Sequence, residues 1–145
     1  MEFLTTSPKT LQSVWNELAV TKDRSPSLAT VGWQWRLGWI RRCLNIDEAF
    51  CRDVLQQALE DRALVVRAEA ATIMGQKFED TKDAKILAQL ERAYKNPRNL
   101  RNGKPMFIQR RILFSIHQVG GKTADGLGER LARSNQTTQD YWRKL

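Results

Sequence analysis

The sequence predicts an all-α protein made of antiparallel helical hairpins, with about five to seven helices in all. Three observations lead to this prediction. Apolar residues recur at helical spacing over most of the 145 residues. No segment shows the alternation of apolar and polar residues that is typical of a strand. Two helix pairs also match each other at constant offsets, which indicates a repeated unit.

The helix that follows Asp61 organises the rest of the chain. One apolar stripe of this helix has four members, namely Val66, Ala70, Ile73 and Met74. A second stripe runs beside it, so neighbouring elements cover this helix from two directions. Small residues such as Gly75 let those neighbours approach closely. We expect the first stripe to be buried, as in the inner helix of a stacked hairpin.

Residues 8–44 are predicted to form a divergent N-terminal helix pair. Ser7-Pro8 and Ser25-Pro26 are helix-start signals, which favour one helix over residues 8–21 and a second that runs to about Leu44. This pair would cover the N-terminal end of the helices that follow.

Tryptophans divide the second of these helices into two faces. Trp33 shares a stripe with Leu37 and Ile40, and we expect this stripe to be buried against the next helix. Trp35 and Trp39 point in about the opposite direction, where the first helix is available to cover them. If that helix covers both rings, they belong to the core. If it leaves one exposed, that ring is a candidate anchor for a partner, and Trp39 is assigned to this role.

Two repeats follow, over residues 47–78 and 83–120. Apolar positions of their inner helices match at an offset of 42, whereas those of their outer helices match at 32. The difference of ten residues indicates an inserted loop at 96–104, and such insertions often lie at the functional face of a repeat protein. The polar residues 121–145 are predicted to form a C-terminal cap. Three inner-helix residues of the second repeat should be buried, namely Ile108, Ile112 and Ile116.

The order of Asp61, Val66-Arg67, Ala70-Ala71 and Gly75 resembles the second helix of a HEAT repeat. The resemblance implies one HEAT-like domain over residues 1–145, a short α-solenoid. It also implies that Asp61 and Arg67 belong to a ladder of polar contacts between adjacent units. The second repeat departs from this pattern, with Gly103 at the Asp position and Gln109 at the Arg position. An irregular helical bundle is the alternative fold.

Positive charge is concentrated in about one fifth of the chain. The net charge is +8, and the span from Arg92 to Lys122 holds eight basic residues and no Asp or Glu. Such a span indicates a surface for phosphates or for an acidic protein, although a solvated polar face is the alternative. Phe107 or Tyr94 could stack on bases, but both also suit helix packing. The candidate partner-binding residues of this span are Arg98, Arg101, Lys104, Arg110 and Arg111.

Motifs for catalysis or metal binding do not stand out. Gly120-Gly121-Lys122-Thr123 lacks the upstream glycine and strand of a phosphate-binding loop, so a helix stop is the better interpretation. His117 is the only histidine and has no metal-ligand spacing to Cys43 or Cys51. The paired carboxylates are explained as helix caps. No catalytic residue, cofactor or metal is therefore predicted.

The two cysteines are interpreted as core thiols in a reduced, cytoplasmic protein. No signal peptide or membrane-spanning segment is predicted. The favoured function is a non-enzymatic scaffold or adaptor that binds a macromolecule, preferably a protein, through its inner helices and basic loop. Nucleic-acid binding by residues 92–122 is the alternative, and a small HEAT-fold enzyme is a third. A homo-oligomer is left open.

Overall fold

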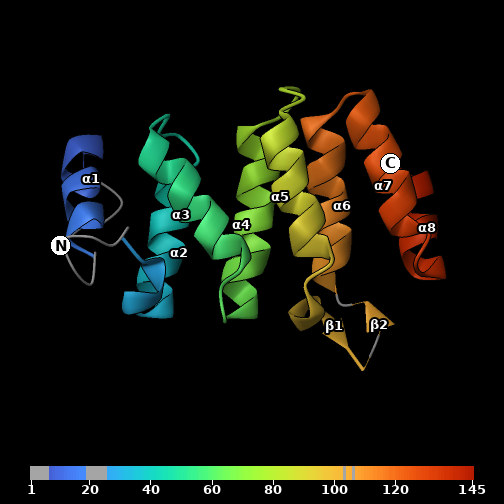
Figure 1. Cartoon of the computed structure of the whole chain (residues 1–145), viewed down its shortest axis with the longest axis horizontal. Coiled ribbons are helices and arrows are strands. Elements are labelled where there is room, and N and C mark those ends of the chain that lie inside the picture. Colours follow the sequence, from blue (N-terminus) through green and yellow to red (C-terminus); the bar gives the residue numbers. More distant parts are fainter. Residues whose placement is uncertain (1–6, 19–25, 103, 106) are drawn as a thin grey trace.

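The computed structural model describes residues 7–18, 26–102, 104–105 and 107–145. Within these ranges the chain is all-α, as predicted, with one more helix than expected because both C-terminal segments form helices (Figure 1). The eight helices are α1 (Pro8–Glu17), α2 (Trp33–Arg42), α3 (Ala49–Leu59), α4 (Leu64–Lys77), α5 (Ala84–Tyr94), α6 (Phe107–Val119), α7 (Lys122–Ala132) and α8 (Gln136–Arg143). The short elements are the 3₁₀ turns η2 (Leu28–Thr30) and η3 (Pro97–Asn99) and the strands β1 (Leu100–Arg101) and β2 (Lys104–Pro105).

The helices form two rows. In one row, hereafter the inner row, α2, α4, α6 and α8 contact one another in succession. In the other, hereafter the outer row, α3, α5 and α7 contact one another and cover the first row. Antiparallel pairing brings the start of each inner helix next to the end of the outer helix before it, so the turns that precede α4 and α6 lie at the same edge of the molecule (Figure 1).

The predicted inner-helix stripes lie in the core. All of the stripe residues named above for α4 and α6 are at most 3% exposed. Gly75 lies where α4 and α6 meet, and a Cβ atom at this position would come within 2.8 Å of the Cα of Ser115. The hydroxyl of Ser115 also donates to the carbonyl of Ala71 at 2.6 Å. The predicted close approach at a small residue is therefore confirmed for Gly75.

Buried polar side chains connect successive inner helices. Arg36 on α2 forms an ion pair with Asp61 in the turn before α4, with N–O distances of 2.7 and 3.0 Å. Arg67 on α4 donates to the backbone carbonyl of Asp61 at 2.8 Å and to the side chain of Asn99 at 2.9 Å. Asn99 is fully buried and donates to the carbonyl of Ala93. Asn99, not the aligned Gly103, therefore supplies the side chain that receives Arg67.

The tryptophan faces of α2 differ from the prediction. Trp39 is 1% exposed because Trp15 of α1 and Phe50 of α3 hold its ring edge-on, with centroid distances of 5.6 and 6.2 Å. Its assignment as a partner-binding residue is therefore wrong. Trp33, expected in the core, is 47% exposed, and Trp35 is 44% exposed. The helix begins at Trp33 rather than near residue 26, so both rings lie in its first turn, at the edge of the molecule.

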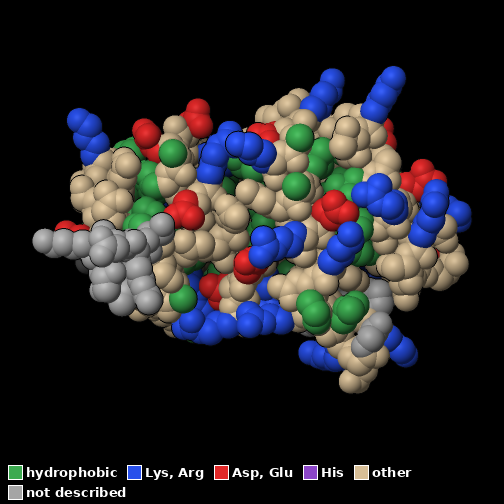
Figure 2. All heavy atoms as spheres, viewed as in Figure 1, with side chains coloured by type: hydrophobic (Ala, Val, Ile, Leu, Met, Phe, Trp, Pro, Cys, Tyr) green, Lys and Arg blue, Asp and Glu red, His purple; other side chains and the backbone are tan. Residues whose placement is uncertain are grey.

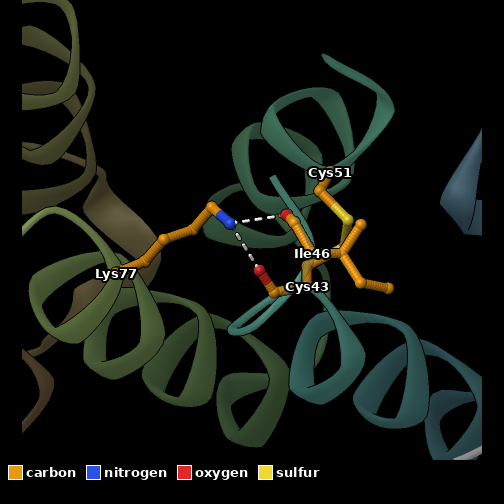
Figure 3. The surroundings of a disulfide bond; sticks show 4 residues. All are labelled: Cys43, Ile46, Cys51 and Lys77. Carbon is orange, nitrogen blue, oxygen red and sulfur yellow. Dashed lines mark hydrogen bonds between the residues drawn. A yellow bond between two sulfur atoms is a disulfide. The ribbon is translucent and has the colours of Figure 1, made fainter. Parts of the chain in front are cut away.

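The cysteines also differ from the prediction, since Cys43 and Cys51 form a disulfide in the described structure rather than two thiols. Their Cα atoms lie 5.2 Å apart because the chain reverses between α2 and α3 (Figure 3). Lys77 of α4 holds the same turn, donating to the carbonyls of Cys43 at 2.8 Å and Ile46 at 2.6 Å. Burial lowers the pKa of Lys77 against the opposing effect of Asp47.

The inserted loop forms a short antiparallel hairpin of β1 and β2, although no strand was predicted. The turn contains Asn102, whose φ of 53° lies in the left-handed region that Asn tolerates. The hairpin projects from the edge of the helical rows beside the start of α6 (Figure 1). After α6, Gly120 and Gly121 both have positive φ, which confirms the predicted helix stop at these residues.

Candidate basic and aromatic binding surface

The predicted basic loop lies on the surface of the hairpin. Arg98, in η3, together with Arg101 and Lys104, on the two strands, are all exposed. Arg98 is anchored at both ends, since its carbonyl accepts from Arg67 at 3.2 Å and its guanidinium lies 3.5 Å from the carbonyl of Glu60. Burial and the neighbouring charge of Arg98 lower the pKa of Arg67. The loop is therefore held against the start of α4 by Arg67 and against the end of α3 by the contact of Arg98 with Glu60.

The other predicted basic residues, Arg110 and Arg111, are exposed in the first turns of α6. The guanidinium of Arg111 reaches α4, where it donates to the hydroxyl of Thr72 at 2.8 Å. Both arginines thus belong to the inner row. The hairpin directly precedes α6 in the chain, so its basic residues lie near the start of the same helix. The five basic residues predicted for this span therefore lie on consecutive elements of the chain, which are η3, the two strands of the hairpin and α6.

These five residues form no ion pair with a carboxylate in the part of the chain that the structure describes. Most basic residues on the outer helices and at their C-caps do pair with Asp or Glu, namely Arg52, Arg92, Lys95, Arg130 and Arg133, whereas Lys85 and Lys122 form no ion pair with the described residues. Figure 2 shows the face formed by the outer row, where both signs of charge are mixed and Lys and Arg gather along the lower edge and around the hairpin. Uncompensated charge is therefore a feature of the hairpin and α6.

A groove lies along the inner row between α4, α6 and α8. Its volume is about 470 Å³, and no Asp or Glu lines it. Its walls hold Phe107, Arg110, Arg111 and Phe114 from α6 and Tyr141 from α8. Its polar residues are Thr72 and Gln76 of α4 with Ser115 and Gln118 of α6. The groove thus brings positive charge, aromatic rings and neutral hydrogen-bonding groups together.

Large apolar side chains are exposed in and near this groove. Phe107 is 45% and Phe114 is 42% exposed on α6, whereas Tyr94, the other aromatic residue considered for stacking, is 4% exposed. Phe114 and Tyr141 had not been predicted as site residues. Phe107, Arg111 and Phe114 are spaced to lie on one face of a helix, and this spacing could have indicated Phe114. Tyr141 could not be found in this way, because it joins the site only through the packing of α8 beside α6.

A second group of exposed apolar residues lies at the starts of the other inner helices. Trp33 and Trp35 occupy the first turn of α2, and Val65, which is 50% exposed, occupies that of α4. Arg62 in the turn before α4 is also exposed, and its guanidinium lies 3.4 Å from the carbonyl of Ala29. The edge that carries the basic hairpin therefore also carries tryptophan rings.

The described residues contain no group of three or more His, Cys, Asp and Glu side chains placed to hold a metal ion. His117 is exposed on α6, with its ring edge-on to that of Trp142 at a centroid distance of 6.1 Å. None of the described helices is long and apolar enough to cross a membrane.

The fold and this surface define an all-α protein with a basic, aromatic groove on its inner row. In comparisons with known proteins, no family model, no curated protein and no solved structure matches the chain.

Proposed function

We propose that this chain is a non-enzymatic HEAT-like scaffold that binds another protein through its inner row and basic hairpin. The observation that supports this best is the uncompensated positive charge of the hairpin and α6 beside exposed aromatic rings. Interface centres are enriched in aromatic residues and Arg, and charge complementarity guides association. An acidic protein surface is the partner that fits both features.

The HEAT-like assignment has support from the arrangement of the helices. Hairpins of one outer and one inner helix repeat along the chain, and buried polar contacts join adjacent units through Arg36–Asp61 and Arg67–Asn99. The sequence resemblance implies a ladder of this kind. Stacked hairpins of this type offer long, rigid surfaces for macromolecular partners.

Nucleic-acid binding is the second candidate. It is favoured by α6, where Phe107 and Phe114 flank Arg110 and Arg111, because aromatic rings can stack on bases while guanidinium groups contact phosphates. Binding of this kind weakens steeply with salt, since counterions are released from the phosphates. Titration of random duplex and single-stranded DNA at two salt concentrations separates this candidate from the first.

Purification with the full chain as bait tests the proposed function. A variant carrying Arg98→Glu, Arg101→Glu and Lys104→Glu should lose the protein that co-purifies with the wild type. Its melting temperature should stay nearly unchanged because the three side chains are exposed. Equal recovery of the partner by both proteins would exclude the hairpin from the interface. Recovery that disappears after nuclease treatment would favour the second candidate.

A further inference from the structure

The groove between α4, α6 and α8 lies over a close contact between α4 and α6, since Ser115 belongs to both. Gly75 leaves room for the backbone of Ser115, and the Ser115 hydroxyl donates to the carbonyl of Ala71. The larger side chains on either side of this line of contact then stand above it as walls. Because α4 and α6 are tightly packed against each other, the fold fixes the positions of the residues that line the groove.

The charge of the groove is entirely positive. The guanidinium of Arg110 makes no hydrogen bond or ion pair with the described residues, and that of Arg111 makes one hydrogen bond, to Thr72. A guanidinium has five N–H donors, so most of the donors at this site remain available. Arginine pairs with carboxylates by two parallel hydrogen bonds, which makes carboxylate groups a matching ligand.

The aromatic walls set a length. Phe107 and Phe114 are seven residues apart on one helix, which places them about 10 Å apart along its axis. An extended peptide rises about 3.3 Å per residue, so about four residues span the two rings. A segment of that length can place an apolar side chain between the rings and acidic side chains on the arginines.

The polar part of the groove favours a peptide over a nucleic acid. Gln76 and Gln118 make no side-chain hydrogen bond to a described residue, and their amide groups both donate and accept. A peptide backbone presents N–H and C=O groups, which use both functions. Phosphate oxygens only accept, so a nucleic-acid backbone would use donors alone.

We propose that this groove binds a short, extended acidic segment of a partner protein. An aromatic or aliphatic side chain of the segment lies between Phe107 and Phe114, its carboxylates pair with Arg110 and Arg111, and its backbone contacts Gln76 and Gln118. This inference rests on the proposed function and names the chemistry that the inner row recognises. It does not require the basic hairpin.

An array of synthetic 12-residue peptides tests this proposal with the full-length protein. Acidic content and aromatic content vary independently across the array, and binding is then measured by fluorescence anisotropy for the peptide with the highest signal. We expect selection of peptides that carry both features. Phe107→Ala with Phe114→Ala, and separately Arg110→Glu with Arg111→Glu, should each weaken binding at least tenfold. The matched control is Arg133→Glu at the C-cap of α7, an exposed arginine outside the groove, which should change binding less than twofold.

Other outcomes would overturn the proposal. Selection on acidic content alone, or binding that survives the paired phenylalanine substitutions, would indicate non-specific charge attraction. Tighter binding of a 12-nucleotide oligothymidine than of any peptide would assign the groove to nucleic acid. Absence of binding to the whole array would also reject the acidic-peptide site. The proposed function would still stand if the partner purification depended on the hairpin, so the two failures are distinguishable.

Discussion

Arg36 and Asp61 form a buried ion pair with two N–O contacts, which connects α2 to the turn before α4. Arg36 also donates to the carbonyl of Val31 at 2.6 Å, and Asp61 accepts from the backbone N–H of Ala63 at 2.8 Å. The pair therefore satisfies a backbone carbonyl in the turn before α2 and a backbone N–H in the turn before α4. Each charge depends on the other, because the side chains of Arg36 and Asp61 are only 2% and 5% exposed.

Asp61→Ala should lower the free energy of unfolding by about 3–5 kcal/mol, since it leaves the Arg36 guanidinium buried without its counter-charge. Arg36→Met combined with Asp61→Ala should recover part of this loss by removing the stranded charge. Urea denaturation of the wild type, both single variants and the double variant gives the coupling energy. Additive losses in the double variant would show that the pair does not act as a unit.

Gly75→Ala should destabilise the protein by about 1–3 kcal/mol through overpacking, because the added Cβ would meet the backbone of Ser115. Gly126 is the matched control, as it is also helical but a Cβ there meets nothing within 4 Å. Gly126→Ala should stabilise by up to about 1 kcal/mol. Thermal unfolding measures both, and effects of the same sign would contradict the close helix approach at Gly75.

The tryptophans of α2 allow a direct test of burial. Trp39→Ala should cost about 3–5 kcal/mol, because it removes a ring packed between Trp15 and Phe50. Trp33→Ala should have little effect on chemical denaturation, since that ring is about half exposed. Equal losses in the two variants would place Trp33 in the core, as the sequence pattern had indicated.

Helical periodicity was sufficient to predict α4 and α6, because residues such as Val66 and Ile112 have apolar neighbours at most core-facing positions. The same reasoning was wrong for Trp33. A stripe is buried only where another element lies against it, and at the start of α2 the described elements leave Trp33 47% exposed. Periodicity describes the faces of a helix and not the neighbours that cover them.

The basic residues of the candidate surface were predicted from a span of the sequence that holds no Asp or Glu, whereas the groove was not predicted. Its aromatic wall includes Tyr141 of α8, which reaches the site because α8 packs directly against α6. Asn99 was missed for a related reason: the insertion displaced it from the aligned position of Asp61. The cysteines pair because a tight reversal brings their Cα atoms together, which spacing alone does not specify.

The disulfide should stabilise the folded chain by about 2–3 kcal/mol, the value expected for closing a loop with a sequence separation of 8. Cys43→Ala with Cys51→Ala should lower the melting temperature of the oxidised protein. Adding dithiothreitol should lower the melting temperature of the wild type in the same way but leave the double variant unchanged. An identical melting temperature for the wild type with and without reductant would show that the bond contributes nothing.

Asp83 provides a prediction on pH because its carboxylate caps α5. It accepts hydrogen bonds from the backbone N–H groups of Lys85 at 2.9 Å and Ile86 at 3.2 Å, and its second oxygen lies 3.4 Å from the guanidinium of Arg52. Burial alone raises the pKa of Asp83, but the hydrogen bonds from Ile86 and Lys85 and the charge of Arg52 outweigh it and lower the pKa. The folded state therefore favours the ionised form.

A carboxyl with a depressed pKa in the folded state stabilises the protein above its unfolded pKa of about 3.9, and this contribution is lost as the pH falls through the folded value. Asp83→Ala should therefore lower the unfolding free energy by about 1 kcal/mol at pH 7, and the difference from the wild type should shrink below about pH 4. Asp83→Asn keeps a capping acceptor without the charge, so it should lose less at pH 7. Urea denaturation from pH 3 to 7 tests both variants. A deficit in Asp83→Ala that stays constant over this range would mean that the ionised carboxylate has no part in the cap.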